Sequence, residues 1–165
     1  MRISNALLAG FMLSWAAGPV WAADDTIIQR LALCQDSWLD MQKGDPAQLK
    51  TTGDHLRAVF APPNGDEPFV LPNTNLTIAG MRITQAFPNS VGMGVGFSAT
   101  VAAPFDVARK NVESVMGKKL PHCEASDGMK SCELQIAEKR TVMLMAADPP
   151  DKNGTLIGCY YFYEK

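Results

Sequence analysis

The stretch Cys123-Glu-Ala-Ser-Asp-Gly-Met-Lys-Ser-Cys132 places a turn signal midway between two cysteines. Asp127-Gly128 favours a two-residue hairpin turn, because both turn positions take positive φ angles. With these two residues in the turn, Cys123 lies opposite Cys132 in a non-hydrogen-bonded pair. The Cα atoms of such a pair are about 4.5 Å apart, within the range that a disulfide accepts. We therefore predict an antiparallel hairpin closed by a Cys123–Cys132 disulfide.

The other two cysteines, Cys34 and Cys159, are then left to pair with each other. The chain has four cysteines, and an even number in an exported protein indicates disulfides. A Cys34–Cys159 bridge would join the first helix to the last strand, and closing so long a loop contributes about 4 to 5 kcal/mol in the chain-entropy model. The alternative is that these two are buried free thiols. No Cys-x-x-Cys motif or zinc-site spacing is present.

The N-terminal residues 1–22 have the pattern of a secretory signal peptide. Arg2 supplies the positive charge, residues 6–17 are mostly apolar and uncharged, and small residues occupy the −3 and −1 positions of a cleavage site after Ala22. The apolar stretch is shorter than the roughly 20 residues that span a bilayer. We expect a periplasmic or secreted protein whose single α+β domain covers residues 23–165. An uncleaved membrane anchor is the alternative.

The charge balance of the chain disfavours some classes of binding partner. The chain has 165 residues, with 15 Lys and Arg against 17 Asp and Glu. This weak acidity, without a basic run, argues against nucleic acid and against anionic membrane surfaces. The rest of the sequence has no apolar stretch of spanning length, so we expect no stable membrane association after cleavage.

The spacing of apolar residues outlines the secondary structure. We expect helices at 24–44 and 104–117, and a short helical turn at 45–49. We expect strands at 56–60, 76–87 (with a bulge near Gly80), 91–101, 141–147 and 155–163, and the Asp-Gly hairpin at 123–137. Short links between strands imply antiparallel neighbours. The predicted fold is α+β: a meandering antiparallel β-sheet with an N-terminal helix and a central helix packed on one face, and two disulfides.

One face of the predicted strand 91–101 carries small residues, among them Gly92, Gly94, Gly96 and Ser98. Several glycines in register indicate that something approaches the backbone closely. A packed helix or strong sheet curvature would explain them. The functional interpretation is the floor of a groove for a small apolar ligand or a partner segment, with a cavity of at least about 300 Å³. A dinucleotide-binding loop is excluded, because that motif requires a strand-to-helix turn.

Three further features bear on function. Two turn-rich loops, 62–68 and 148–154, are suited to contact a partner, because loops on a rigid scaffold commonly carry recognition. Their candidate contact residues are Asn64, Asp66, Asp151, Lys152 and Asn153.

Met143 and Met145 share a strand face, and thioethers are soft ligands that favour Cu(I). Methionine more commonly fills gaps in a core, so we predict no metal site.

Signals for an enzyme are poor. The sequence has no nucleophile elbow, zinc-protease helix or phosphate loop. Asp54 and His55 are adjacent and would point to opposite faces of a strand. We predict no catalytic residue and no cofactor. The leading hypothesis is a non-enzymatic binding module that recognises another exported protein, as an inhibitor, immunity-type or accessory factor. A carrier of a small apolar ligand over strand 91–101 is the first alternative, and an uncharacterised enzyme the second.

Overall fold

The computed structural model describes residues 22–88, 90–91, 94–147 and 154–162. The predicted signal peptide therefore lies outside the described residues, apart from its last residue, Ala22. Within the described part, no helix is both long enough and apolar enough to cross a bilayer.

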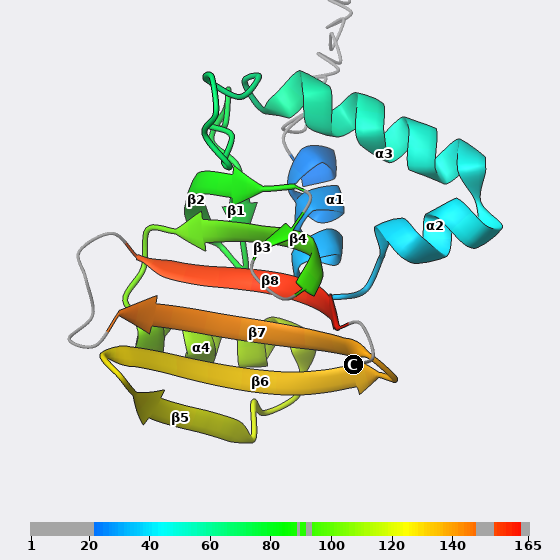
Figure 1. The fold of residues 1–165 in the computed structure, drawn as a ribbon. Helices are drawn as coiled ribbons and strands as arrows, with labels where there is room; N and C mark the ends of the chain where they lie inside the picture. The colour runs from blue at the N-terminus through cyan, green and yellow to red at the C-terminus, as the bar shows by residue number, and fades with distance from the viewer. Residues whose placement is uncertain (1–21, 89, 92–93, 148–153, 163–165) are drawn as a thin grey trace, which may run out of the picture.

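The core of the molecule is one antiparallel sheet (Figure 1). Its strands are β1 (Thr77–Ile78), β2 (Met81–Phe87), β3 (Ser90–Val91), β4 (Gly94–Val101), β5 (His122–Ser126), β6 (Met129–Ala137), β7 (Arg140–Ala147) and β8 (Thr155–Phe162). Their order across the sheet is β1-β2-β4-β8-β7-β6-β5, and β3 pairs with β4. The last strand of the chain thus lies in the middle of the sheet, between β4 and β7.

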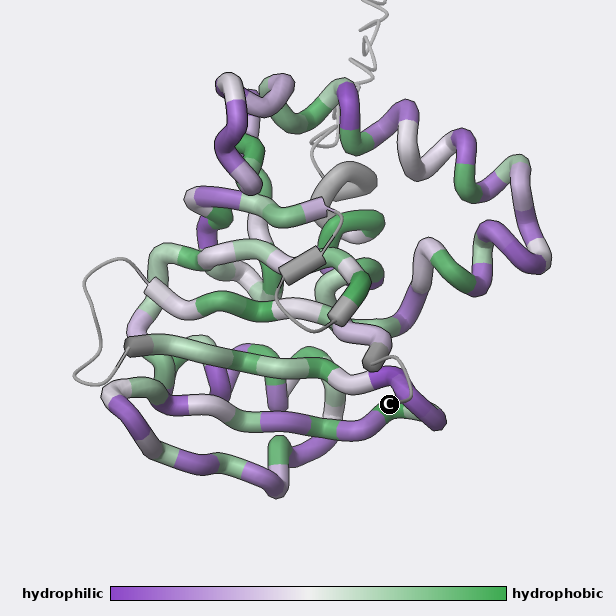
Figure 2. Tube along the Cα trace, in the orientation of Figure 1, coloured by the Kyte–Doolittle hydropathy of each residue, from purple (hydrophilic) through white to green (hydrophobic). Residues whose placement is uncertain are grey.

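Two of the described helices, α1 (Ala22–Ala32) and α4 (Phe105–Met116), cover one face of this sheet. The helices α2 (Trp38–Gly44) and α3 (Pro46–Val59) lie beside the sheet, where they contact each other and α3 contacts α1. Figure 1 shows α1 and α4 behind the strands, whereas no helix of the described residues lies in front of β6, β7 and β8. The covered face is apolar: Phe97, Cys159 and Val142 are neighbours across β4, β8 and β7, and all three are buried. Along β6, hydrophilic and hydrophobic residues alternate (Figure 2). The predicted α+β fold is confirmed.

Both predicted disulfides are present. Cys123 pairs with Cys132 in the hairpin register, and the Cα atoms of this disulfide are 4.0 Å apart. The turn residues Asp127 and Gly128 have φ angles of 51° and 74°, as the Asp-Gly signal requires. Cys34 and Cys159 form the second disulfide, with a Cα–Cα distance of 5.0 Å. It fastens the segment after α1 to the central strand β8.

The prediction of one long first helix is wrong, because the helix ends after α1 and a separate helix, α2, begins at Trp38. Cys34 has a φ of 57°, and the amide of Gln35 donates to the carbonyl of Arg30 at 2.8 Å. This is the bonding pattern of a Schellman motif, which ends a helix. Ser37 then starts α2, since its Oγ accepts a hydrogen bond from the Asp40 amide at 3.3 Å. The apolar spacing continued across the break and concealed it.

The predicted helical turn at 45–49 is the first turn of a longer helix, α3, and the prediction of a strand at 56–60 is wrong because α3 extends to Val59. Asp45 caps this helix, its Oδ1 accepting from the Gln48 amide at 2.9 Å, and Pro46 suits the first helical position. The buried residues of α3 are Thr52, Leu56 and Val59, which follow helical spacing. A glycine in the middle of the segment, Gly53, does not end the helix.

Two strand predictions need correction. Ala79 and Gly80 are not a bulge: they are the two-residue turn between β1 and β2, with φ angles of 51° and 74°. The bulge of β2 lies a few residues further along the strand. The predicted strand 91–101 falls into two strands, because Val91 belongs to β3 and pairs antiparallel with Gly94 of β4.

Candidate functional site

A groove of about 560 Å³ lies beside α3. Its walls come from α3, from the first residue of α2, from the segment that follows α3 and from the end of β2. The lining side chains are mainly apolar: Trp38, Leu56, Phe60, Ala61, Pro62, Pro63, Val70 and Pro88, with Gly53 and Arg57 on the α3 side. The volume falls within the range of about 300 to 1,000 Å³ that is typical of ligand sites.

Backbone hydrogen bonds hold the wall formed by residues 60–72. The amide of Ala61 donates to the carbonyl of Leu71 at 2.8 Å, so the two arms of this loop are joined. Val70 and Ala86 exchange a pair of backbone hydrogen bonds of 2.8 and 2.9 Å, which attach the loop to β2. The wall is therefore fixed to the sheet before any ligand binds.

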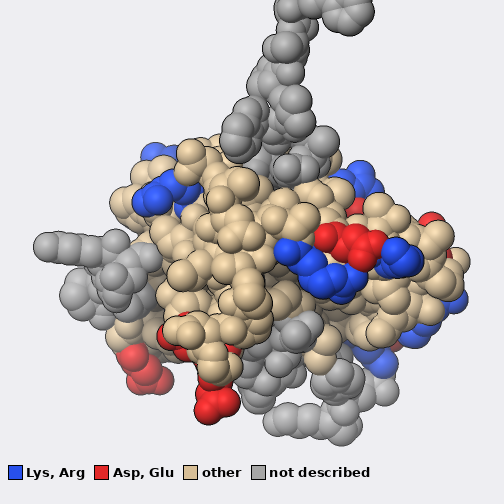
Figure 3. Space-filling model, turned by 90° about the horizontal axis from the view of Figure 1, so that it is seen from above, with Lys and Arg blue, Asp and Glu red and all other residues tan. Residues whose placement is uncertain are grey.

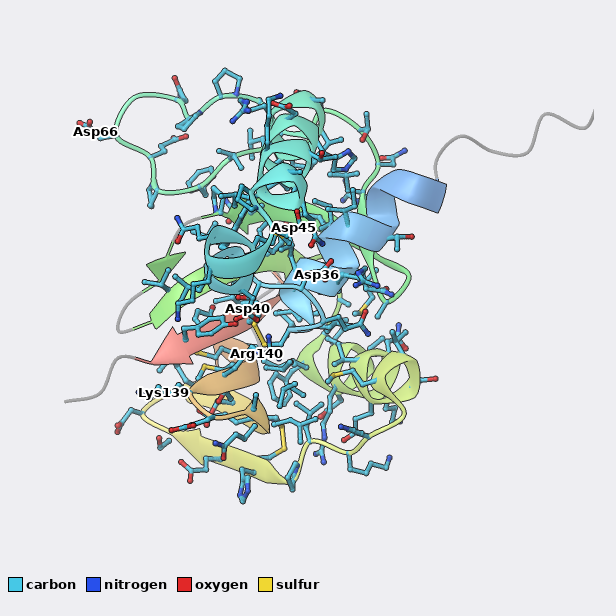
Figure 4. All side chains as sticks on the ribbon, turned by 90° about the vertical axis from the view of Figure 1, so that its right-hand side faces the viewer. Asp36, Asp40, Asp45, Asp66, Lys139 and Arg140 are labelled. Carbon is cyan, nitrogen blue, oxygen red and sulfur yellow. A yellow bond between two sulfur atoms is a disulfide. The ribbon has the colours of Figure 1, made fainter. Side chains whose placement is uncertain are left out.

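A polar cluster holds α2, and with it Trp38, against the sheet. The Tyr161 hydroxyl of β8 donates to Ser37 Oγ, and Arg140 of β7 donates to Asp40 Oδ2 at 2.6 Å. Figure 4 shows Asp40 and Arg140 side by side. Ser37 is buried, and it is also the N-cap of α2. Residues from two strands thus set the position of the helix that contributes the tryptophan of the groove.

The charged rim of the groove belongs to α3. Asp54 accepts from Lys50 at 2.6 Å and from Arg57 at 2.5 Å, and basic and acidic atoms alternate over this helix in Figure 3. The hydrogen bond from Lys50, followed by that from Arg57, holds the pKa of Asp54 below its ordinary value. Two cations thus flank one carboxylate, and Arg57 is the charged side chain that lines the groove.

Of the two loops predicted to contact a partner, the structure describes 62–68 in full but only the last residue of 148–154. Asn64 and Asp66 are exposed, and Asp66 lies at the loop tip, away from the body of the molecule (Figure 4). Pro62 and Pro63 of the same loop line the groove. The residues Asp151, Lys152 and Asn153 of the second loop lie outside the described residues.

The glycines of β4 serve close contact between strands. Gly92 lies outside the described residues, whereas Gly94, Gly96 and Ser98 pair with Phe162, Tyr160 and Gly158 of β8. A Cβ atom added at Gly96 would lie 1.8 Å from the carbonyl oxygen of Cys159, and one added at Gly158 would lie 2.4 Å from Ser98 Cβ. Neither position can carry a side chain without moving the neighbouring strand.

The two histidines are far apart in the fold. His55 is half-buried within α3, and His122 is exposed at the start of β5. Across the described ranges, no group of three His, Cys, Asp or Glu side chains is placed to hold a metal ion. All four cysteines are in disulfides, so none offers a catalytic thiol.

Sequence reasoning did not find this groove. The sequence predicted Trp38 on the core face of one long helix and Leu56 and Phe60 in a strand, and nothing in that prediction placed the three residues together.

The chain matches no protein family, and searches of curated proteins and of solved structures find no match either. The groove and the chemistry of its walls therefore carry the functional argument.

Proposed function

We propose that this chain is an exported, non-enzymatic binding module that holds an apolar segment of another exported protein in the groove beside α3. The observation that carries this proposal is the groove itself: about 560 Å³ lined by Trp38, Phe60, Leu56 and proline side chains. Large aromatic side chains such as tryptophan, once a partner has buried them, are typical of the residues that dominate protein interfaces.

The rigidity of the walls supports recognition of a partner. Trp38 is fixed through the Ser37 cluster, and the loop wall is attached to β2 by backbone hydrogen bonds. A preformed groove loses less conformational entropy on binding than a flexible one does. Arg57, with five donors and a side chain that is 73% exposed, offers hydrogen bonds to carbonyl or carboxylate oxygens next to an apolar anchor.

Export is supported by two independent features. Residues 1–22 have the order of charge, apolar run and small residues that is typical of a secretory leader. The two disulfides suit an oxidising compartment such as the periplasm or the extracellular space. The partner would therefore be another exported protein.

A small apolar ligand carried over the glycine face has weaker support. The close approaches at Gly96 and Gly158 already account for the absence of side chains there. The proposed module uses the groove beside α3 instead of that face.

Site-specific photocrosslinking in the producing cell tests the proposal. A photoreactive phenylalanine analogue is placed at position 63 in the groove wall or, as a control, at position 107, where Val107 of α4 is 46% exposed. We expect position 63 to give a crosslinked adduct of defined mass with an exported protein, and position 107 to give none. Identical adduct patterns at both positions, or no adduct at position 63, would contradict the proposal.

A further inference from the structure

The sheet face opposite α1 and α4 carries a contiguous apolar patch, and Figure 1 looks onto this face. Met143 and Met145 lie two residues apart in β7, and Met145 is opposite Leu156 of β8. Met129 of β6 is diagonal to Met145, since it is two residues before Ser131, the direct partner of Met145. Met129 is 55% exposed, and the other three are half-buried. We call Met129, Met143, Met145 and Leu156 the open-face patch.

The open-face patch is elongated. Met129 lies opposite Ala147, which is four residues from Met143 along β7. At the usual rise and spacing of strands, Met129 and Met143 are therefore about 14 Å apart. Side chains at that separation cannot meet at one ion, but the distance matches about two and a half turns of an α-helix. The shape of the patch thus suits an extended element of another polypeptide.

The strands under the patch determine how such an element can bind. β6 lies between β5 and β7, and β7 lies between β6 and β8, so the edges of both strands are already paired. An incoming segment cannot add a strand here and must lie across the face. On the opposite face, α4 packs against β7 and α1 against β8 in this way. A helix packed on a sheet is one of the common layer arrangements of proteins.

Two carboxylates beside the patch favour a cationic partner. Glu133 of β6 lies opposite Met143, and Glu124 of β5 lies opposite Ser131, so both are on the open face. Among the paired residues of β5 to β8, this face carries no Lys or Arg. His122 is also on it, opposite Glu133 on the side away from β7. Basic side chains that approach from the patch side would be attracted by both carboxylates, and acidic ones would be repelled.

We propose that the open-face patch binds a cationic amphipathic α-helix of another polypeptide. The apolar side chains of that helix, three and four residues apart, pack on the patch, and its Lys or Arg side chains face Glu124 and Glu133. Methionine is unbranched and adapts to different surfaces, so the patch suits a class of helices more than one sequence. This site is separate from the groove beside α3 and does not depend on the function proposed for it.

Fluorescence anisotropy with two designed peptides tests the proposal. The first probe is a labelled helix of about 14 residues, long enough for the patch, with leucine and lysine in amphipathic order. The second has glutamate in place of every lysine. We expect the lysine probe to bind, with an affinity that falls as salt is added, and the glutamate probe to bind at least about tenfold more weakly, since its charge is repelled.

Replacing Glu124 and Glu133 together by glutamine should weaken binding of the lysine probe about tenfold, the contribution of two exposed ion pairs. The matched control is Asp106→Asn with Glu138→Gln, which removes the same net charge elsewhere. Asp106 is exposed on α4, and Glu138 is exposed in the turn after β6. This control should bind the lysine probe as the wild type does. An equal loss in both double variants would mean attraction to net charge alone and would overturn the proposal.

Methyl NMR of methionine-labelled protein locates the bound probe. The lysine probe should shift the ε-methyl signals of Met129, Met143 and Met145 and leave that of Met116, which packs against the core from α4, unchanged. The proposal is overturned if the wild type does not bind the lysine probe, if both probes bind equally, or if these three signals do not shift. Sedimentation of the wild type as a dimer that the probe does not dissociate, with the three methyl signals buried in it, would assign the patch to a second copy and would also overturn it.

Discussion

Glu113 in α4 is a buried carboxylate whose partners hold the end of the helix. It is 8% exposed and accepts from Lys119 at 2.8 Å, from the Leu120 amide at 3.0 Å and from Arg109 at 3.1 Å. These hydrogen bonds, that from Lys119 first, lower the pKa of Glu113 to about 2. The ionised Glu113 side chain is therefore stabilised in the folded protein relative to the unfolded chain.

The substitution Glu113→Gln should reduce the free energy of unfolding by about 1 to 2 kcal/mol at pH 7, because hydrogen bonds to a charged acceptor become neutral ones. A depressed pKa stabilises the fold above the unfolded value of 4.5, and this contribution is lost as the pH falls toward 2. Urea unfolding from pH 7 down to pH 2.5 should thus show the wild type and the variant converging. A difference that stays constant across that range would contradict this role of Glu113.

Single residues also show what could be predicted from the sequence. Asp127-Gly128 specifies its turn through local backbone preferences, so the hairpin register and the Cys123–Cys132 pairing followed from counting. The helix-ending conformation of Cys34 could not be predicted from local backbone preferences in the same way. Its positive φ is common for glycine and rare for cysteine, and the structure places it at a helix end where the tertiary disulfide with Cys159 also holds it.

At the scale of elements, α3 is the helix that sequence reasoning missed, and the groove was missed with it. The segment 46–59 contains Gly53 and is weakly apolar, and both features lowered its helical signal. Packing of Leu56 and Val59 against the rest of the core decided the outcome, since tertiary contacts commonly override local propensity. The strands β5, β6 and β7 were predictable because two-residue turns link them in sequence order.

The substitution Gly53→Ala should stabilise the protein by about 0.5 to 1 kcal/mol, because glycine is unfavourable in a helix interior. The added methyl group would lie 3.6 Å from Arg57 Nη1, an ordinary contact. Thermal unfolding followed by circular dichroism measures the effect.

Gly117→Ala is the matched control with the opposite sign. Gly117 ends α4 with a φ of 62°, where a Cβ atom costs about 1 to 2 kcal/mol. If Gly53→Ala destabilised the protein as much as Gly117→Ala does, position 53 would not lie within an unstrained helix.

At the scale of the whole molecule, the two disulfides make unequal contributions. Cys34–Cys159 spans 125 residues and joins the α1 end of the chain to the central strand, whereas Cys123–Cys132 spans nine within one hairpin. In the chain-entropy model, they stabilise the fold by about 5 and about 3 kcal/mol.

Replacing Cys34 and Cys159 together by alanine should therefore lower the urea midpoint more than replacing Cys123 and Cys132 does. Because Ser37 and Trp38 follow Cys34 closely, the first variant should also shift the emission of Trp38, and the second should leave it unchanged. A larger drop of the urea midpoint on removal of the hairpin disulfide would contradict this ranking of the two bridges.

The central claim is that the groove beside α3 takes up a segment of an exported partner, and occlusion of the groove tests it most directly. Gly53 lines the groove, whereas a Cβ atom at Gly44 meets nothing within 4 Å. Gly53→Phe fills the groove, and Gly44→Phe places the same side chain at the end of α2. The measurement is the yield of the photocrosslinked adduct from position 63 in these two variants. We predict that the adduct is lost in Gly53→Phe and retained in Gly44→Phe; an undiminished adduct in Gly53→Phe would contradict the claim.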